Sequence, residues 1–319
     1  MTASTRMFEG FAEQELATDR GSVFARIGGT GPPLLLLHGY PQTHVMWHAV
    51  APLLADRYTL VVADLPGYGG SFRPAAAPDH APHSKRSLAI DLVQAMEAAG
   101  FEQFAVAGHD RGGRVAYRMA LDHPGSVAAA AVLDVVPTGE VWARADAHLA
   151  LVYWHWAFLA QPAPLPERLI NADPDAFFDL HVRALGLGRE PGRYPIDLMT
   201  TYRRLLDDPG IVEAICEDYR AGATIDRQHD DTDLGQRVID CPLLVLWSAR
   251  GALPRLYEDV LDVWRAWAPN IAGQGIDASH FIAEDAPEVT ADLLSSFLDR
   301  HSFFGVPTDA PSGKARHAT

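Results

Sequence analysis

Short apolar runs alternate with helix-like patterns in the first part of the chain, and this alternation restricts the fold more than any other feature. The runs occupy residues 22–27, 34–37, 59–63, 104–107 and 128–133. Several of them are almost wholly apolar, as strands are when both faces of a parallel sheet are covered. Helical patterns, such as the one over 87–99, lie between them. This order predicts an α/β fold with a mostly parallel, doubly wound sheet.

The alternation is interrupted over residues 139–229, where aromatic residues are frequent and no comparable strand-like run appears. Strand-like runs resume at 242–247 and near 271–277. We therefore expect three parts: a core formed by 1–138 and 230–301, an inserted helical cap formed by 139–229, and a loose tail at 302–319. Ligands of open α/β sheets bind at the carboxyl ends of the strands, so residues that directly follow each run are candidates for a site.

The run at 104–107 leads into the sequence GHDRGG, residues 108–113, and then into a helical pattern. Glycines two places before and after Asp110 permit a sharp strand-to-helix turn, because a Cβ at either place would collide with neighbouring backbone. This is the outline of the nucleophile elbow of α/β-hydrolases, with an aspartate where most carry a serine. We predict the α/β-hydrolase fold with Asp110 as the nucleophile. The alternative is that Asp110 only caps the following helix.

Two further residues have the positions expected of the partners of Asp110. His280 follows the last strand-like run, which agrees with the chain order nucleophile, acid, histidine. Many α/β-hydrolases carry the acid near 247–253, but this segment has no carboxylate. Asp134 ends the strand before the cap, and we predict that it orients His280 and stabilises its cationic form. The alternative is that Asp134 caps a loop.

A loop that begins with His-Gly follows the run at 34–37. In α/β-hydrolases such a loop supplies one backbone N–H group of the oxyanion hole, and the residue after the nucleophile supplies the other. The predicted donors are the N–H groups of Tyr40 and Arg111.

A carboxylate nucleophile suits displacement at a saturated carbon. The product of the attack is an alkyl ester, and water activated by His280 can hydrolyse it, whereas the ether that a serine would form is inert. The leaving group would be a halide or an epoxide oxygen, and the covalent cycle needs neither a metal nor an organic cofactor. His44 and His48 form an H-x-x-x-H pair without a third ligand, so we interpret them as part of a helix face.

Two arginines accompany the nucleophile. Arg111 is adjacent to Asp110, and Arg114 lies one helical turn along on the same face. Their charge would keep Asp110 ionised, and two guanidinium groups can hold a carboxylate in bidentate fashion. A haloacid needs such a grip and a neutral haloalkane does not. The alternative is that the arginines form ion pairs with surface acids.

The chain resembles the fluoroacetate dehalogenase family of α/β-hydrolases. The matching stretches are HGYPQTHVMWH (38–48), VVADLPGYGGS (61–71), AGHDRGGRVAYRMALD (107–122), AVLDVVPT (131–138), YWHWAFLAQPAPLPE (153–167), CEDYRAGATIDRQHD (216–230) and SHF (279–281). The resemblance implies a role for each site residue: Asp110 as nucleophile, His280 as base, Asp134 as its partner, Arg111 and Arg114 as ligands of the substrate carboxylate, and His155, Trp156 and Tyr219 as donors to the departing halide. It also implies a homodimer.

The chain departs from the family at a few positions. The family often has phenylalanine at the position of Tyr40 and a small residue other than glycine at that of Gly113. The cap segment 181–188 does not match the family pattern, and close relatives are expected to have a bulky aromatic residue near the position of Leu185. A less aromatic lining would favour larger 2-haloacids or weaken action on C–F bonds.

Composition excludes several classes of partner. The net charge of −15 argues against non-specific binding to nucleic acid or to anionic membranes. Cys216 and Cys241 are the only two cysteines and suggest neither a disulfide framework nor a zinc site, so we expect a reduced cytoplasmic protein. The first residues lack the apolar core of a secretory signal, and no stretch is long and apolar enough to span a membrane.

Three functions compete at this point. The first is hydrolysis of a small anionic 2-haloacid, such as fluoroacetate, to a 2-hydroxy acid and halide. The second is an epoxide hydrolase, for which Tyr153, Tyr202 and Tyr219 are candidate acids, although the two arginines would then have no role. The third is a catalytically silent α/β-hydrolase that binds a small ligand, although such a receptor has no need of an aspartate nucleophile.

Overall fold

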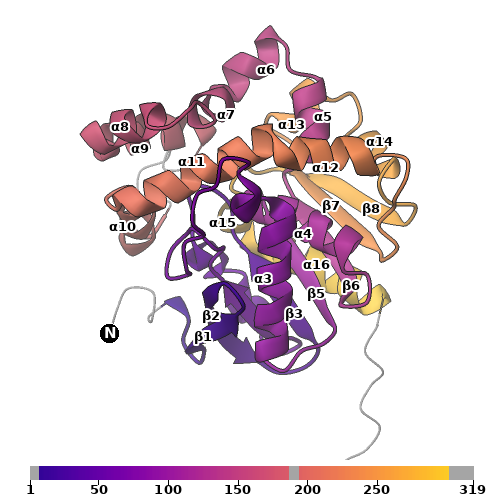
Figure 1. The fold of residues 1–319 in the computed structure, drawn as a ribbon. Coiled ribbons are helices and arrows are strands. Elements are labelled where there is room, and N and C mark those ends of the chain that lie inside the picture. Colours follow the sequence, from indigo (N-terminus) through magenta and orange to yellow (C-terminus); the bar gives the residue numbers. More distant parts are fainter. Residues whose placement is uncertain (1–6, 187–193, 302–319) are drawn as a thin grey trace, which may run out of the picture.

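The computed structural model describes residues 7–186 and 194–301, so the expected tail at 302–319 lies outside it. Its centre is a sheet with the strand order β1-β2-β4-β3-β5-β6-β7-β8 (Figure 1). The strands are β1 Ala12–Thr18, β2 Gly21–Gly29, β3 Pro33–Leu37, β4 Thr59–Ala63, β5 Phe104–His109, β6 Val127–Leu133, β7 Leu243–Ser248 and β8 Ile271–Ile276. All neighbours from β4 to β8 pair in parallel, and β2 pairs antiparallel with both β1 and β4. The predicted α/β fold with a mostly parallel sheet is confirmed.

The central strands form where the sequence is continuously apolar. In β3, the residues from Leu34 to Leu37 are all buried and pair on both sides with buried residues of β4 and β5. Strand β1 was not predicted. It is an edge strand in which only Leu16 is buried, opposite Val23 of β2, so its sequence AEQELAT carries no apolar run. Pairing with β2, rather than burial, makes this segment a strand.

Helices of the core cover the two faces of the sheet. They are η1 His44–Trp47, α2 Ala51–Leu54, η2 Ala81–His83, α3 Lys85–Ala98, α4 Arg111–Asp122, α13 Leu253–Leu256, α14 Val260–Arg265, α15 Ile282–Asp285 and α16 Pro287–Arg300. Helix α3, expected over 87–99, begins two residues earlier because Ser84 caps it by accepting a hydrogen bond from the N–H of Ser87.

A second group of helices lies between β6 and β7 in the chain. They are α5 Thr138–Ala143, α6 Ala147–Val152, α7 Trp154–Leu159, α8 Leu165–Ala172, α9 Pro174–Leu185, α10 Ile196–Leu205, α11 Pro209–Ala223 and α12 Ile225–Asp233. Figure 1 shows most of them above the sheet, with α11 and α12 running across its top. We call this group the cap helices. The division of the chain at 138/139 and 229/230 stays a proposal, and α12 crosses the second boundary.

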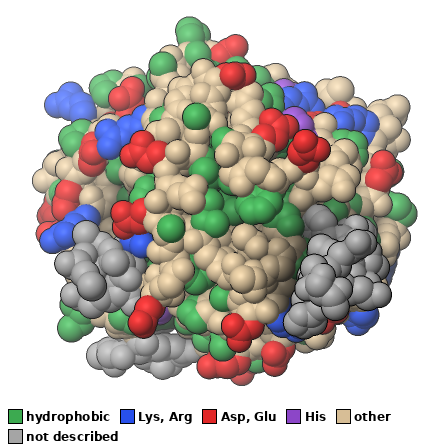
Figure 2. All heavy atoms as spheres, turned by 90° about the horizontal axis from the view of Figure 1, so that it is seen from below, with side chains coloured by type: hydrophobic (Ala, Val, Ile, Leu, Met, Phe, Trp, Pro, Cys, Tyr) green, Lys and Arg blue, Asp and Glu red, His purple; other side chains and the backbone are tan. Residues whose placement is uncertain are grey.

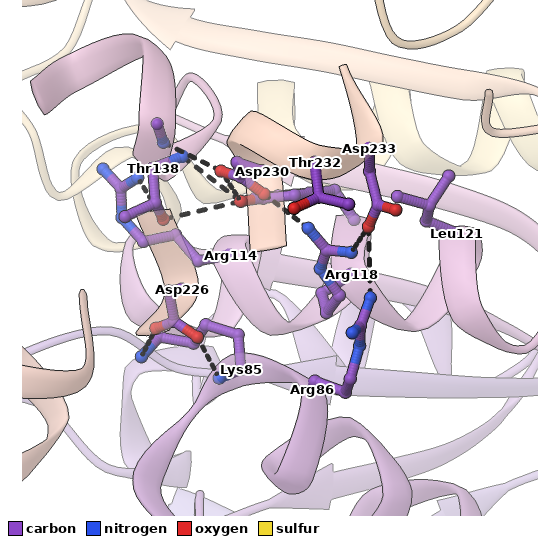
Figure 3. Close-up of polar contacts among 12 residues, drawn as sticks. Lys85, Arg86, Arg114, Arg118, Leu121, Thr138, Asp226, Asp230, Thr232 and Asp233 are labelled. Atoms are coloured by element: carbon purple, nitrogen blue, oxygen red, sulfur yellow. Dashed lines mark hydrogen bonds and ion pairs between the residues drawn. The ribbon is translucent and has the colours of Figure 1, made fainter. Parts of the chain in front are cut away.

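Buried ion pairs fasten α11 and α12 to α3 and α4. Four aspartates of the cap helices face cations of the core helices. The pairs join Lys85 to Asp218 and Asp226, Arg118 to Asp230 and Asp233, and Arg86 to Asp233. We call this set of ion pairs the ion-pair row. Figure 3 shows its part around Arg118, where Asp230 also accepts a hydrogen bond at 2.8 Å from the N–H of Gly139 in α5. Such pairs fix the position of the cap helices, because a partner left alone would be a buried charge.

Figure 2 shows the face of the molecule that is turned away from the cap helices. Apolar side chains gather near its centre, and acidic side chains lie around them. In the ranges that the structure describes, none of the helices combines the length and apolar character needed to cross a bilayer.

The ion-pair row makes a prediction for stability. Replacing Asp230 by asparagine leaves the buried Arg118 with less compensation and should lower the free energy of unfolding by about 3 kcal/mol. Its neighbour Asp231 is the matched control, because its pair with Arg227 is exposed on both sides. Asp231→Asn should change stability by less than about 0.5 kcal/mol. Urea unfolding measures both, and equal losses would contradict the structural role of the row.

Candidate functional site

A cavity of about 330 Å³ lies where the carboxyl ends of the strands meet the cap helices. Its wall takes residues from the loops after β3, β5, β6, β7 and β8, which are the strand ends that the fold predicts for a site. Those loops and the helices that follow them contribute Tyr40, Asp110, Arg114, Asp134, Arg250, Gly251, Ala252, Arg255, Ser279, His280 and Asp285, and the cap side contributes Val152, Tyr153, His155, Trp156, Leu185, Gly186, Tyr194 and Tyr219.

Asp110 sits on a strained turn between β5 and α4. Its φ of 46° and ψ of −114° lie outside the regions that non-glycine residues prefer, at a cost of about 1–3 kcal/mol. The flanking glycines are required sterically. A Cβ on Gly108 would come within 2.2 Å of the carbonyl oxygen of Gly112, and one on Gly112 within 2.4 Å of the carbonyl oxygen of His38. The turn exposes Asp110 at the amino end of α4, where the helix dipole favours negative charge.

His280 lies between two carboxylates. Its Nδ1 is 2.6 Å from Oδ2 of Asp134, and its Nε2 is 3.9 Å from Oδ2 of Asp110. The other oxygen of Asp134 accepts a hydrogen bond from the N–H of Ser248 at 2.9 Å, which fixes the carboxylate. Burial opposes a charged ring, but the hydrogen bond to Asp134 and the charges of both aspartates raise the pKa of His280 above its usual value. The arrangement suits a base whose Nε2 faces the nucleophile.

A hydrogen-bonded chain behind His280 was not predicted from the sequence. The Nε2 of His109 lies 2.8 Å from the carbonyl oxygen of His280, and its Nδ1 lies 2.9 Å from Oε1 of Gln42. Gln42 in turn donates to Glu284 at 2.7 Å, and so does the hydroxyl of Tyr202 at 2.6 Å. These residues position the backbone of the base. The one available signal was the place of His109 directly before the nucleophile.

Arg114 is a buried cation without a carboxylate partner. Its residue is only 4% exposed, and its Nη1 donates to the carbonyl of Val136 at 2.9 Å and to the hydroxyl of Thr138 at 3.2 Å. In the described part of the chain no aspartate or glutamate pairs with it, and its Nε has no acceptor. The guanidinium lies 4.5 Å from the ring centre of Trp156. A buried charge is costly unless it is paired, so this side of the cavity is prepared for an anion.

From the sequence we expected Arg111 and Arg114 to bind the substrate carboxylate in the same way, but the structure places Arg111 differently. Its Nε donates to the carboxylate of Asp218 at 2.6 Å and its Nη2 to the carbonyl of Asp218 at 2.8 Å. Among the described residues that line the cavity, Arg114 is present and Arg111 is not. Asp218 is a buried acid of α11 and not a surface acid, and Lys85 and Tyr68 bind it too. Only Nη1 of Arg111 is left without an acceptor among the described residues.

The three candidate halide donors all line the cavity and are buried. Within the described ranges, Nδ1 of His155 and the hydroxyl of Tyr219 have no hydrogen-bond partner. Burial, with the neighbouring His181, holds the pKa of His155 well below its usual value, so the ring is neutral. Burial and Asp110 raise the pKa of Tyr219 well above its usual value, so the hydroxyl keeps its proton. Together with Trp156 these groups offer uncharged donors to an anion.

The backbone N–H groups of Tyr40 and Arg111 form no hydrogen bond with any described residue, so both stay available to an oxyanion. His44 and His48 have structural partners: His44 binds Asp64 at 2.8 Å, and His48 lies 3.1 Å from the carbonyl of Val45. The described residues contain no group of three or more histidine, cysteine and acidic side chains that could hold a metal ion.

The divergent cap segment reaches the cavity through Leu185 and Gly186. Gly186 has a φ of 115°, which favours glycine, and a Cβ there would come within 2.9 Å of Cβ of Ser279. The rest of the segment, 187–188, lies outside the described residues.

Comparison with known proteins agrees with this geometry. The α/β hydrolase fold family matches residues 32–177. A fluoroacetate dehalogenase from Burkholderia sp is 45% identical over 92% of this chain and 95% of its own length. A soluble epoxide hydrolase from Corynebacterium sp. is 28% identical over 85% of this chain and 91% of its own.

A solved structure gives the same result. It is a mutant of a Pseudomonas aeruginosa protein, provisionally described as an epoxide hydrolase and crystallised with bound MFA. It is 46% identical, has a TM-score of 0.85, and covers 92% of this chain and 98% of its own. The fold, the strand-end cavity and this similarity lead to one conclusion: the chain belongs to the fluoroacetate dehalogenase family of the α/β-hydrolase fold.

Proposed function

We propose that this protein hydrolyses small 2-haloacids, with haloacetate as the reference substrate, to 2-hydroxy acids and halide. The observation that carries the proposal is Arg114: a buried guanidinium that lines the same cavity as Asp110 and forms no ion pair with a carboxylate in the described chain. A substrate carboxylate would neutralise it and bring the adjacent carbon to the nucleophile. The similarity to a fluoroacetate dehalogenase supports the same substrate class.

In the first step, a carboxylate oxygen of Asp110 attacks the carbon that bears the halogen. The carbon–halogen bond breaks, an aspartyl ester forms, and the halide leaves with both bonding electrons. Arg114, with the remaining N–H of Arg111, would hold the substrate carboxylate. His155, Trp156 and Tyr219 would stabilise the halide as its charge develops, because donors fixed in advance need no reorganisation at that moment.

In the second step, Nε2 of His280 takes a proton from water, and the resulting hydroxide attacks the ester carbonyl. The N–H groups of Tyr40 and Arg111 would stabilise the oxyanion. The intermediate then expels the 2-hydroxy acid and regenerates Asp110, while Asp134 stabilises the imidazolium until it loses its proton. The overall reaction consumes one water and releases one halide and one proton, without a metal or an organic cofactor.

The epoxide hydrolase alternative remains the second candidate. Tyr153 and Tyr219 both line the cavity and are available as acids, whereas Tyr202 is bound to Glu284. An epoxide would leave the charge of Arg114 uncompensated, which is why the haloacid is preferred. A protein that only bound a small ligand would not need the arrangement of Asp110, His280 and Asp134. The resemblance supports a homodimer, which size-exclusion chromatography would test, and the two unpaired cysteines support a cytoplasmic location.

Asp110→Asn should abolish halide release. An amide oxygen is a poor nucleophile, so turnover should fall by roughly 10⁴-fold or more. A halide electrode, with fluoroacetate and chloroacetate as substrates, measures the loss. Asp231→Asn serves as the control for a carboxylate far from the cavity, and halide release by Asp110→Asn at the original rate would contradict the mechanism.

Arg114→Met should weaken action on acids selectively. Losing a buried charge pair with the substrate costs about 2–4 kcal/mol, or roughly 30- to 1000-fold in kcat/KM for chloroacetate. Neutral chloroacetamide should lose less than about threefold, because it makes no such pair. The matched control is Arg250→Met, since Arg250 also lines the cavity but pairs with Asp277 at the exposed surface. An equal loss on both substrates would argue against carboxylate binding.

The pH dependence should report His280. The pKa of His280 is raised above the usual 6.5, and only the neutral ring can act as a base. We therefore expect kcat to fall as the pH drops through this raised pKa. Asp134→Asn removes the interaction that raises the pKa, and should move the acid limb to lower pH while reducing kcat by about 10³- to 10⁴-fold. Steady-state pH profiles of the two proteins test this, and an unmoved acid limb would refute the assignment of Asp134.

A further inference from the structure

Four buried side chains form an aromatic group at one end of the cavity, between the loop after β3 and the cap helices. Tyr40, His155, His181 and Tyr219 are each at most 4% exposed. The ring centres of His155 and His181 are 4.5 Å apart, and Tyr40 lies 5.6 Å from His181 and 5.5 Å from Tyr219. We call these four residues the ring cluster.

The ring cluster contains more unsatisfied polar atoms than the proposed halide site uses. In the described part of the chain, five buried atoms have no hydrogen-bond partner: the hydroxyls of Tyr40 and Tyr219, Nδ1 of His155, and both ring nitrogens of His181. Buried polar atoms are nearly always paired in native proteins, so such a concentration points to a polar ligand held there. The reaction as proposed gives a role only to the atoms of His155 and Tyr219.

Tyr40 stands out within the cluster. It lines the cavity together with Asp110, His155 and Tyr219, and its ring centre lies 5.5 Å from that of Tyr219 and 6.5 Å from that of His155. Packing in this place needs only the aromatic ring, and the hydroxyl adds a buried polar atom that a phenylalanine would not have. Burial raises the pKa of Tyr40 well above its usual value, and the charge of Asp110 raises it further, so the hydroxyl keeps its proton and can donate a hydrogen bond.

Neighbouring protein groups do not satisfy this hydroxyl. The thiol of Cys216 is at most a weak acceptor, and burial keeps it protonated by raising its pKa. His181 is also neutral, since burial lowers its pKa to about 4. The four side chains of the ring cluster are therefore uncharged, and the guanidinium of Arg111 lies 4.2 Å from the ring centre of Tyr219. Uncharged donors of this kind suit a small anion, such as a leaving group that gains negative charge as its bond to carbon breaks.

We propose that the hydroxyl of Tyr40 is a further donor to the departing halide, in addition to those of His155, Trp156 and Tyr219. This inference rests on the proposed dehalogenation. Its ligand class is the halide ion, and fluoride in particular. Fluoride is the smallest halide and the strongest hydrogen-bond acceptor, so an additional O–H donor lowers the barrier to its departure more than that of chloride.

Tyr40→Phe tests the proposal, because it removes only the hydroxyl and keeps both the ring and the backbone N–H proposed for the oxyanion. The rate of fluoride release from fluoroacetate should fall by about tenfold, and that of chloride release from chloroacetate by about two- to threefold. The ratio of the two rates should therefore fall several-fold. The control is Tyr58→Phe, whose hydroxyl binds Asp299 outside the cavity and should leave the ratio unchanged.

A ratio that stays the same in Tyr40→Phe would overturn the inference, since a merely structural effect lowers both rates equally. Inhibition of chloroacetate turnover by added sodium fluoride is the second measurement, and it serves also if the natural protein cleaves only C–Cl bonds. The inhibition constant for fluoride should rise at least about threefold in Tyr40→Phe, and an unchanged constant would refute the role. Release of neither halide by the natural protein would defeat the proposed function itself, and the inference with it.

Discussion

The buried carboxylate of Asp218 connects the cap helices to the core next to the proposed active site. It belongs to α11 of the cap helices and binds Lys85 of α3, Arg111 of α4 and Tyr68 of the core. Its neighbour in sequence, Tyr219, is thereby held over the cavity. The position of Tyr219 relative to the nucleophile thus depends on the ion pairs of Asp218, which is not among the described residues that line the cavity.

The same ion pair makes the two arginines of the elbow helix unequal. Asp218 pairs with Arg111, whereas no carboxylate in the described part of the chain pairs with Arg114. The chain carries a net charge of −15, which would repel an anionic substrate at long range. Solvent and salt screen that distant charge, whereas a buried guanidinium acts at contact in a low dielectric. In the proposed function, the local cation therefore decides what binds in the cavity.

The sequence predicted those strands and site residues whose structure depends on a local pattern of residues. The run at 59–63 is β4, and Asp110, Asp134 and His280 follow strands that apolar composition reveals. The cause of other features is not local. Strand β1 forms by pairing with β2, and the link between Gln42 and Glu284 joins residues 242 positions apart. The partner of Arg111 could not be found either, because Asp218 reaches it only after α11 has docked on the core.

The strained turn at Asp110 has a consequence for how activity can change in such proteins. Gly108 and Gly112 set the path of the backbone, and neither can take a side chain without a collision. The side chain at position 110 contributes nothing to that path, since it points away from the turn into the cavity. The glycines thus determine where the attacking residue lies, and the side chain at position 110 determines which atom attacks. A substitution at this position changes the attacking atom and keeps both glycines, whereas a side chain at either glycine would collide with the backbone that forms the turn.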